Sequence, residues 1–247
     1  ASHCGSGGTL TIVNSTFSDN HATENSGSGM GGAIVNSATL TIKNSTFSGN
    51  SASSGGGGIL NQATLNLENT ILANNTTDTG NNDCVNSGGD TIATNINNLI
   101  ENNAASGNMC GTPSFTADPS LGPLANNGGS TQTHALLAGS PAIDEGNDAV
   151  CVAAPVNNES QNGLSRPQGA HCDIGAYEAA LPSVELNPSS LNFGSQLVGT
   201  TSPAQTVTVT NTGTADLTLG ALSISGQFAL NNNLCNGKTL APAQKCT

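Results

Sequence analysis

One short stretch of the chain has residue types and spacing that could bind a metal ion. Asp144, Glu145 and Asp148 lie within five residues of one another, with Asn147 between them. Carboxylate and amide oxygens are the ligands that Ca²⁺ prefers. The spacing differs from that of an EF-hand, and the chain has no Gly-Gly-x-Gly-x-Asp repeat. The stretch therefore predicts, at most, a structural calcium site formed by Asp144, Glu145 and Asp148.

Basic residues that could act in catalysis are scarce. Besides histidine, the chain has four: Lys43, Arg166, Lys238 and Lys245. Lys43 occupies the same place in its repeat as Glu68 in the next repeat, so we expect a charge pair between neighbouring repeats. We expect Arg166 to pair with a nearby carboxylate, either Asp144 or Asp173.

The remaining catalytic arrangements are also unconvincing. A glycosidase needs two carboxylates that converge on one face, but the acidic residues of the repeats fall at different bends: Asp19, Glu24, Glu68, Asp78, Asp83 and Asp90. Ser140, His134 and Asp144 could be written as a triad, but Ser140 precedes Pro141 and no Gly-x-Ser-x-Gly elbow is present. We expect His134 to be a hydrogen-bonded structural residue. The sequence therefore predicts a protein that is not an enzyme.

The charge balance argues against two classes of partner. The chain has 16 acidic and 4 basic residues, for a formal net charge of -12. Nucleic acids and anionic membrane surfaces are both bound through Lys and Arg, so we predict neither partner. No apolar run reaches the roughly 20 residues that span a bilayer, so we predict no direct membrane insertion of this segment.

The elements that must position these residues come from an internal repeat. Residues 9–20 return as 39–50, then more weakly as 64–75, and a degenerate copy lies at 97–102. Self-similarity at a period of about 20–50 residues is typical of a stacked repeat architecture. Such a solenoid presents an extended surface.

Each repeat predicts one coil of a right-handed parallel β-helix with three short strands. In the second repeat these strands are 39–42, 45–48 and 58–61, the first of which alternates polar and apolar residues. The residues expected to point inward are Leu40, Ile42, Phe47 and Ile59. Those expected to point outward are Thr41, Lys43 and Ser48.

Asparagine recurs at fixed bends of the repeat. One bend carries Asn14, Asn44, Asn69 and Asn97, a second Asn20, Asn50 and Asn75, and a third Asn36 and Asn61. Asn tolerates the left-handed backbone of tight bends, and stacked Asn side chains can hydrogen-bond along the stack. We therefore expect structural ladders at Asn14, Asn44 and Asn69 and at Asn20, Asn50 and Asn75.

Seven cysteines are many for a reducing compartment, and none has the C-x-x-C spacing of a zinc site. Proximity in sequence favours the disulfides Cys84–Cys110, Cys151–Cys172 and Cys235–Cys246, although sequence alone does not fix the pairing. Cys4 is then left over and is a candidate for an intermolecular disulfide. The cysteines predict a secreted, extracellular or cell-surface protein.

Several motifs resemble those of bacterial surface proteins. Gly31–Ile34, with the Phe-x-x-Asn motifs at 17–20 and 47–50, resembles the repeats of polymorphic membrane-protein adhesins. Residues 121–137 and 139–144, followed by 166–169 and 172–178, resemble the C-terminal end of the choice-of-anchor Q family of β-helix proteins. The resemblance covers about residues 5–179, although Ser160–Gly163 stands where that family has Asp-Gln-Arg-Gly. It implies an extracellular surface protein and no defined reaction.

A change of composition after the short linker 179–182 predicts a second domain. Alternating stretches such as 205–211 and 222–224 suggest a β-sandwich, and the segment resembles the immunoglobulin-like choice-of-anchor D domains. Such modules usually run to about 100 residues, so we expect this one to be incomplete. The expected organisation is an all-β chain with a parallel β-helix at 1–179, including a capping segment at about 110–179, and a partial sandwich at 180–247.

These features together predict a secreted or cell-surface structural or adhesive protein without a cofactor. The expected partners are further copies that associate end to end, neighbouring domains of a longer chain, or a glycan or surface receptor. An extracellular filament would follow from the first of these. The alternatives are a polysaccharide lyase or hydrolase on a β-helix scaffold, or a glycan-binding module.

Overall fold

The structure is a computed structural model that describes residues 2–4, 7–23, 29–87, 90–104 and 108–247. Glu24 lies outside the described residues, as does the side chain of Cys4. The contacts divide the chain into two compact units, Ala1–Ala179 and Ala180–Thr247. Each unit is described by itself.

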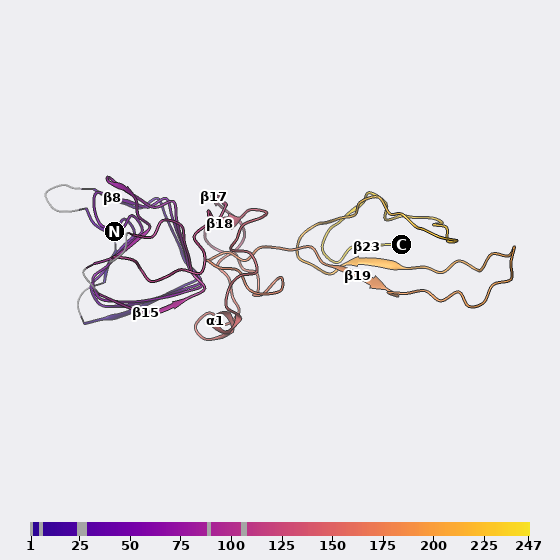
Figure 1. Ribbon diagram of the computed structural model, residues 1–247, viewed down its shortest axis with the longest axis horizontal. Helices are drawn as coiled ribbons and strands as arrows, with labels where there is room; N and C mark the ends of the chain where they lie inside the picture. The colour runs from indigo at the N-terminus through magenta and orange to yellow at the C-terminus, as the bar shows by residue number, and fades with distance from the viewer. Residues whose placement is uncertain (1, 5–6, 24–28, 88–89, 105–107) are drawn as a thin grey trace. The chain divides into compact units, whose positions relative to one another are not determined.

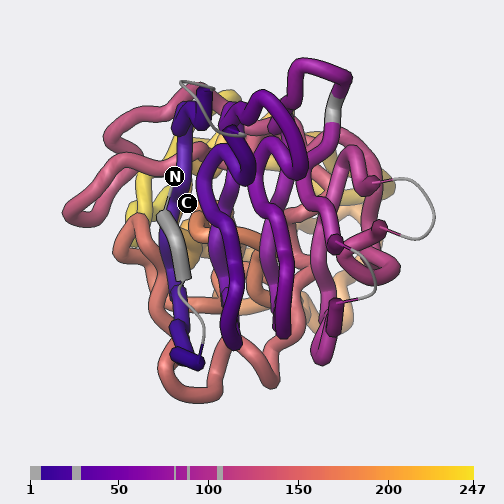
Figure 2. Tube along the Cα trace, turned by 90° about the vertical axis from the view of Figure 1, so that its left-hand side faces the viewer, coloured from indigo at the N-terminus to yellow at the C-terminus, as the bar shows by residue number. Residues whose placement is uncertain are grey.

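The first unit is a parallel β-solenoid, as the repeats predict. Its coils lie side by side in Figure 2 and enclose a common core in Figure 1. The first coil contains β1 (Ser2–Cys4), β2 (Thr9–Val13), β3 (Thr16–Ser18) and β4 (His21–Ala22). The second contains β5 (Ile34–Asn36), β6 (Thr39–Lys43), β7 (Thr46–Ser48) and β8 (Ser51–Ala52). The third contains β9 (Ile59–Asn61), β10 (Thr64–Glu68), β11 (Ile71–Ala73) and β12 (Thr76–Thr77).

A fourth coil consists of β13 (Gly80–Asn81), β14 (Cys84–Asn86), β15 (Thr91–Ile96) and β16 (Leu99–Ile100). Stacking gives four sheets, which we name by their strands: sheet A is β1-β5-β9-β14, sheet B is β2-β6-β10-β15, sheet C is β3-β7-β11-β16 and sheet D is β4-β8-β12-β13. All pairings are parallel except that of β12 with β13. The prediction of three strands per coil was therefore wrong. The strands β4, β8 and β12 are only two residues long, too short to show an alternating pattern.

The interior of the solenoid is a continuous apolar core. Leu40, Ile42, Phe47 and Ile59 are all fully buried, which confirms the predicted inward face. The rings of Phe17 and Phe47 stack in parallel with their centroids 4.6 Å apart. Burial of each such side chain stabilises a fold by about 1.5–3 kcal/mol, so the repeated apolar positions supply much of the stacking energy.

The far end of the fourth coil is closed by residues 101–104 and 108–115. Asp83 N donates to Asn102 O at 2.9 Å, Asn86 N to Asn108 O at 2.7 Å, and Ile100 N to Phe115 O at 3.0 Å. These bonds occupy the edges of β14 and β16 that another coil would use. The Cys84–Cys110 disulfide fixes the same segment to β14.

Residues 116–179, which we call the lateral segment, include β17 (Leu121–Ala125), β18 (Thr133–Leu136) and α1 (Asp148–Val152). They lie beside the coils in Figure 1 and form a second core against the outward face of sheet C. That core contains Ile71, Ala73, Leu99, Leu136, Ala142 and Ile174. The predicted capping segment therefore packs mainly along the side of the stack. Ser48 follows the inward Phe47 and lies on the outward face of sheet C, as predicted, but it is buried there and only 5% exposed.

The second unit consists of two small antiparallel sheets, which are compatible with part of an immunoglobulin-like sandwich. One sheet has the order β19 (Val184–Asn187), β20 (Thr208–Asn211) and β23 (Lys245–Cys246). The other pairs β21 (Leu217–Thr218) with β22 (Thr239–Leu240). Its buried core is small and is built around Cys235, Leu240 and Cys246. The strand predicted at 205–211 is limited to β20.

The stacked core makes a stability prediction. Phe47→Ala removes a fully buried ring from the second coil, and such a change costs about 3–5 kcal/mol. The matched change Phe17→Ala, in the half-buried ring of the first coil, should cost clearly less. Urea unfolding followed by far-ultraviolet circular dichroism measures both, and equal losses would contradict this description of the core.

Candidate functional site

A shallow, open pocket lies where α1 and the loop before it meet the fourth coil. Asn147 caps the helix, and its Oδ1 accepts from Ala149 N at 2.9 Å. The acidic residues next to this cap line the pocket together with His171, which comes from the last part of the lateral segment. The polar side chains that line the pocket are Asn97, Asp144, Glu145, Asn147, Asp148 and His171.

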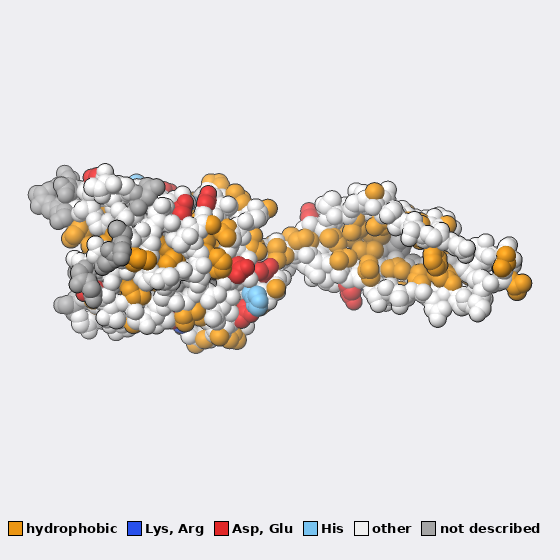
Figure 3. All heavy atoms as spheres, viewed as in Figure 1, with side chains coloured by type: hydrophobic (Ala, Val, Ile, Leu, Met, Phe, Trp, Pro, Cys, Tyr) orange, Lys and Arg blue, Asp and Glu red, His pale blue; other side chains and the backbone are white. Residues whose placement is uncertain are grey.

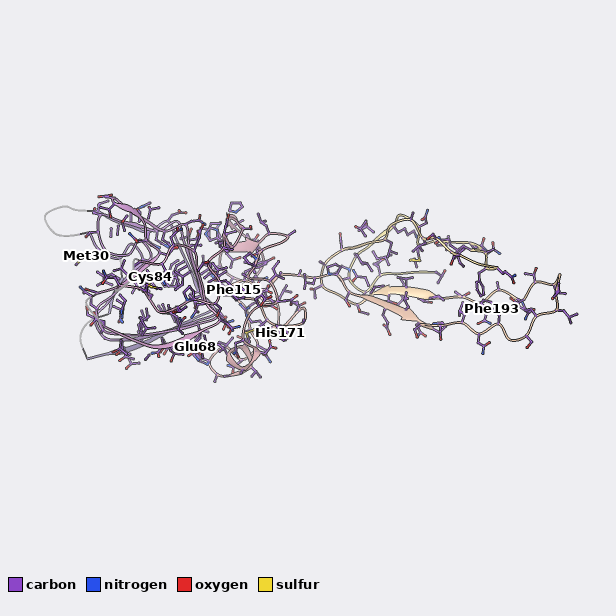
Figure 4. All side chains as sticks on the ribbon, viewed as in Figure 1. Met30, Glu68, Cys84, Phe115, His171 and Phe193 are labelled. Carbon is purple, nitrogen blue, oxygen red and sulfur yellow. A yellow bond between two sulfur atoms is a disulfide. The ribbon has the colours of Figure 1, made fainter. Side chains whose placement is uncertain are left out.

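An ion pair in this pocket joins His171 to Asp148. His171 Nδ1 lies 2.8 Å from Asp148 Oδ2, and Cys172 N donates to Asp148 Oδ1 at 2.9 Å. The hydrogen bond that His171 donates to Asp148 raises the pKa of His171 and lowers the pKa of Asp148. The side chains are 59% and 50% exposed, so solvent screens the pair and its effect on stability is small. Figure 4 labels His171, and Figure 3 shows acidic side chains gathered around a histidine on this face.

The calcium site expected at Asp144, Glu145 and Asp148 receives no support. In the described ranges, no three His, Cys, Asp or Glu side chains gather closely enough to hold a metal ion. Both oxygens of Asp148 already accept hydrogen bonds within the protein. The pocket is therefore an exposed acid–histidine pair beside two further acids.

A buried ion centre lies deeper in the lateral segment. Arg166 Nη1 lies 2.8 Å from Glu178 Oε2 and also donates to Asp173 O at 2.9 Å. Its remaining donors reach Gly175 O at 2.7 Å and Glu159 O at 3.1 Å. This planar fork of donors explains why an arginine fits here and a lysine would not.

The expected partners of Arg166 were wrong. Asp173 uses its carboxylate for the backbone, accepting from Asp144 N at 2.8 Å and from Ala179 N at 2.6 Å. Glu178, which the sequence argument did not consider, takes the ion pair. The signal was available, because Arg166 and Glu178 belong to the two motifs that follow one another at the end of this unit.

Burial controls the protonation of this centre. Desolvation raises the pKa of Asp173 to about 7, with a further contribution from the charge of Glu178. Desolvation also raises the pKa of Glu178 and lowers that of Arg166. All three side chains are at most 2% exposed. A group so enclosed cannot reach a polymer substrate, so the centre is structural.

The other residues weighed for catalysis also have structural contacts. His134 Nδ1 lies 2.8 Å from Gly122 O and Nε2 lies 3.0 Å from Ser18 Oγ, which confirms its structural role. Ser140 Oγ donates to Pro119 O at 2.6 Å, so it is bonded away from His134. Lys43 Nζ lies 2.6 Å from Glu68 Oε2, which confirms the pair between neighbouring coils.

Asparagine side chains form two ladders along the stack. Asn20 Nδ2 donates to Asn50 Oδ1 at 2.8 Å, and Asn50 Nδ2 donates to Asn75 Oδ1 at 2.7 Å. Asn75 Nδ2 then donates to Asp83 Oδ1 at 2.8 Å, so a carboxylate ends the ladder. The second ladder runs through Asn36, Asn61 and Asn86 at 2.6 and 2.7 Å.

The ladder expected at Asn14, Asn44 and Asn69 was wrong. All three have the left-handed backbone that was predicted, with φ of 45°, 44° and 48°. The side chains of Asn44 and Asn69 bind the lateral segment instead of one another, and Oδ1 of Asn14 has no hydrogen-bond partner among the described residues. Asn69 Oδ1 accepts from Asn147 N at 2.8 Å, and Asn44 Nδ2 lies 3.3 Å from Cys151 Sγ. The reason is that sheet C, which begins at this corner, is covered on its outward face.

The disulfides Cys84–Cys110, Cys151–Cys172 and Cys235–Cys246 are all present. Figure 4 shows Cys84 among the coils and Phe115 at their junction with the lateral segment. Nothing can be added on the partner of Cys4, since its side chain is not described.

Comparison with known proteins gives no further assignment. No protein-family model, no curated protein and no solved structure matches this chain. Among the helices of the described ranges, none has the length and apolar character to span a bilayer.

The buried ion centre makes a prediction about substitution. Arg166→Met leaves the Glu178 carboxylate buried without its partner, which should cost about 3–5 kcal/mol. Adding Glu178→Leu should recover part of this loss because both charges are then removed. Lys43→Met, at the more exposed pair, should cost at most about 1 kcal/mol. Chemical unfolding measures all three, and an Arg166→Met variant as stable as Lys43→Met would refute this assignment.

The buried carboxylates predict that stability depends on pH. Burial raises the pKa of Asp83 from 3.8 to about 7, so the folded state keeps a proton that the unfolded state releases above about pH 4. Stability is therefore full below about pH 4 and falls as pH rises to about 7. Asp83→Asn removes this titration, so the loss of stability from pH 5 to pH 7 should become smaller by a few kcal/mol at most.

Thermal unfolding between pH 4.5 and pH 7.5 measures this slope. Asp78→Asn is the matched control, because Asp78 is an exposed acid in the preceding loop. An Asp83→Asn variant with the slope of the native chain would contradict the prediction. Asp173, whose pKa is also raised to about 7, and Glu178, whose pKa is raised by burial, contribute to the slope that remains.

Proposed function

We propose that this chain is part of a secreted or cell-surface protein, in which the solenoid is a non-enzymatic structural or adhesive element. The observation that carries the proposal is that the lateral segment binds several coils at once. Gln161 Oε1 accepts a hydrogen bond from Thr16 in the first coil, and Ala176 N donates to Thr46 Oγ1 in the second. Gly175 N donates to O of Asn69, which directly follows β10 in the third coil.

Such cross-links favour a scaffold that keeps its shape. A bare solenoid contacts only neighbouring repeats and can open locally. Here one segment connects the coils, and its own interior is tied by the Arg166–Glu178 pair and by the Cys151–Cys172 disulfide. A surface element that bears load or presents a binding face benefits from this construction.

The disulfides support the proposed location. Two of them are in the first unit and one is in the second. Disulfides persist in oxidising environments and are rare in reducing ones. An extracellular setting is therefore the one in which both units keep their cross-links.

The motif contacts support membership of the choice-of-anchor Q family as the finer proposal. The stretch 121–137 forms the β17–β18 pair, and its His134 binds Ser18 of the first coil. Arg166 and Glu178, from the two later motifs, bind each other at 2.8 Å. We propose a choice-of-anchor D type immunoglobulin-like fold for 180–247 on the resemblance and on its antiparallel sheets.

The alternative is a polysaccharide-active enzyme, for which the pocket at His171, Asp148 and Asp144 would be the site. Its exposed acid–histidine pair is the observation in its favour. The proposal of a scaffold is preferred because the other groups weighed for catalysis are occupied by structural contacts. Glycan or receptor binding and end-to-end association stay predictions.

A turnover assay tests the proposal. The chain is incubated with neutral and acidic polysaccharides, and new reducing ends and unsaturated products are measured. We expect no product above buffer with the native chain, because the groups that could act are occupied or solvent-screened. If product forms with the native chain and with the control variant Asp78→Asn but not with His171→Ala, the proposal is contradicted and the pocket is an active site.

A further inference from the structure

The outward face of sheet B is a regular surface that the described residues leave uncovered. Sheet C is covered by the lateral segment, and the strands of sheet D are only two residues long. The strands of sheet A are only three residues long in all four coils. Sheet B has strands of five or six residues in all four coils, and β15 lies at the outer edge of the stack in Figure 1.

This face carries two parallel rows of polar side chains, which are all threonine except for Asn66. The register of sheet B aligns one row as Thr9, Thr39, Thr64 and Thr91. The second row is Thr11, Thr41, Asn66 and Thr94. Between the rows, Leu40 and Leu65 point inward and are fully buried, so the alternation of the strands places the row residues outward. The row residues are half-buried or exposed.

The geometry of the rows is fixed by the fold. Neighbouring strands are about 4.8 Å apart, and in β2, β6 and β10 alternate residues are about 6.7 Å apart. In β15 the register shifts, so Thr91 and Thr94 are three residues apart. Threonine is branched at Cβ and has few rotamers, so its hydroxyl and methyl groups hold their positions. Asn66 Nδ2 also approaches Thr41 Oγ1 at 3.3 Å, which links the second row across two coils. The rows form a stiff two-dimensional array.

The array has no net charge although the chain carries a formal charge of -12. The next outward row contains Val13, Lys43, Glu68 and Ile96, and its two charges neutralise each other at 2.6 Å. A charged partner therefore gains nothing here. The two rows also lack an aromatic side chain on which a sugar ring could stack. The complementary partner is uncharged, flat, periodic in two directions and rich in hydrogen-bonding groups.

We propose that the outward face of sheet B binds ice. Hydroxyl groups that repeat at a fixed distance hold water molecules at the same distance. The methyl groups between them offer no hydrogen bond to water in other positions. Each contact is weak, but a rigid array makes many at once, so the later contacts form at a high effective concentration. The inference rests on the proposed scaffold role, because a stiff stack is what keeps the rows in register.

Partition into slowly growing ice tests this proposal with the full chain. We expect the native chain to enrich in the ice fraction. Thr41→Lys, near the centre of the array, should lower that enrichment by about tenfold or more, because a hydrated charge separates the face from the ice. Thr79→Lys is the matched control, since Thr79 is an exposed threonine in the turn between β12 and β13, and it should enrich like the native chain.

A milder variant keeps the test informative if Thr41→Lys does not fold. Thr41→Val preserves shape and removes one hydroxyl, and circular dichroism checks that each variant keeps its strand signal. A native chain that is excluded from ice overturns the proposal, as does Thr41→Lys that enriches fully. Retention on insoluble cellulose or chitin without ice enrichment also overturns it and assigns the face to a glycan. None of these results requires polysaccharide turnover, so failure here is distinguishable from failure of the proposed scaffold role.

Discussion

Rung-to-rung hydrogen bonding by buried asparagine holds the corners of this solenoid together. A corner interrupts the ladder between strands, and a buried backbone group without a partner is costly. Asn50 solves this for its coil: its Oδ1 accepts from Asn20 N at 3.1 Å, and its Nδ2 donates to Phe17 O at 2.9 Å and to Asn75 Oδ1 at 2.7 Å. Only an amide side chain donates and accepts at once with this geometry. Together with the parallel pairing of the strands, these bonds keep the coils in register.

The same stacking creates the surface on which the rest of the unit is built. Because β7, β11 and β16 place apolar or small residues on both faces, sheet C needs a cover, and the lateral segment supplies it. The cover in turn encloses Arg166, whose charge is matched by Glu178 and whose remaining donors find backbone carbonyls. At the far end Asp83 accepts the last ladder bond and also binds Asn102 N at 2.7 Å. The buried polar groups of this unit therefore connect its coils and their cover, which is why we favour a scaffold over an enzyme.

Local patterns in the sequence were sufficient for the coils but not for their cover. The repeated alternation at 39–42 predicted the buried face, and recurrence of Asn20, Asn50 and Asn75 predicted a ladder, because both depend on contacts between equivalent residues one coil apart. The roles of Asn44 and Asn69 could not be predicted in this way, since their partners, Cys151 and Asn147, lie far along the chain. The burial of the outward Ser48 could not be predicted for the same reason. The choice between Asp144, Asp173 and Glu178 as partner of Arg166 likewise required the tertiary fold.

Native-state hydrogen exchange of the first unit, followed by mass spectrometry, tests the central claim that coils and lateral segment form one rigid body. Exchange reports the free energy of local opening for each segment. The account predicts that peptides from β6, β10 and the ion centre at 166–178 exchange only through a shared, high-energy opening, and that Asn50→Ala speeds exchange in all of them. Fast exchange of 166–178 while the coils stay protected, or an effect of Asn50→Ala confined to its own coil, would contradict it.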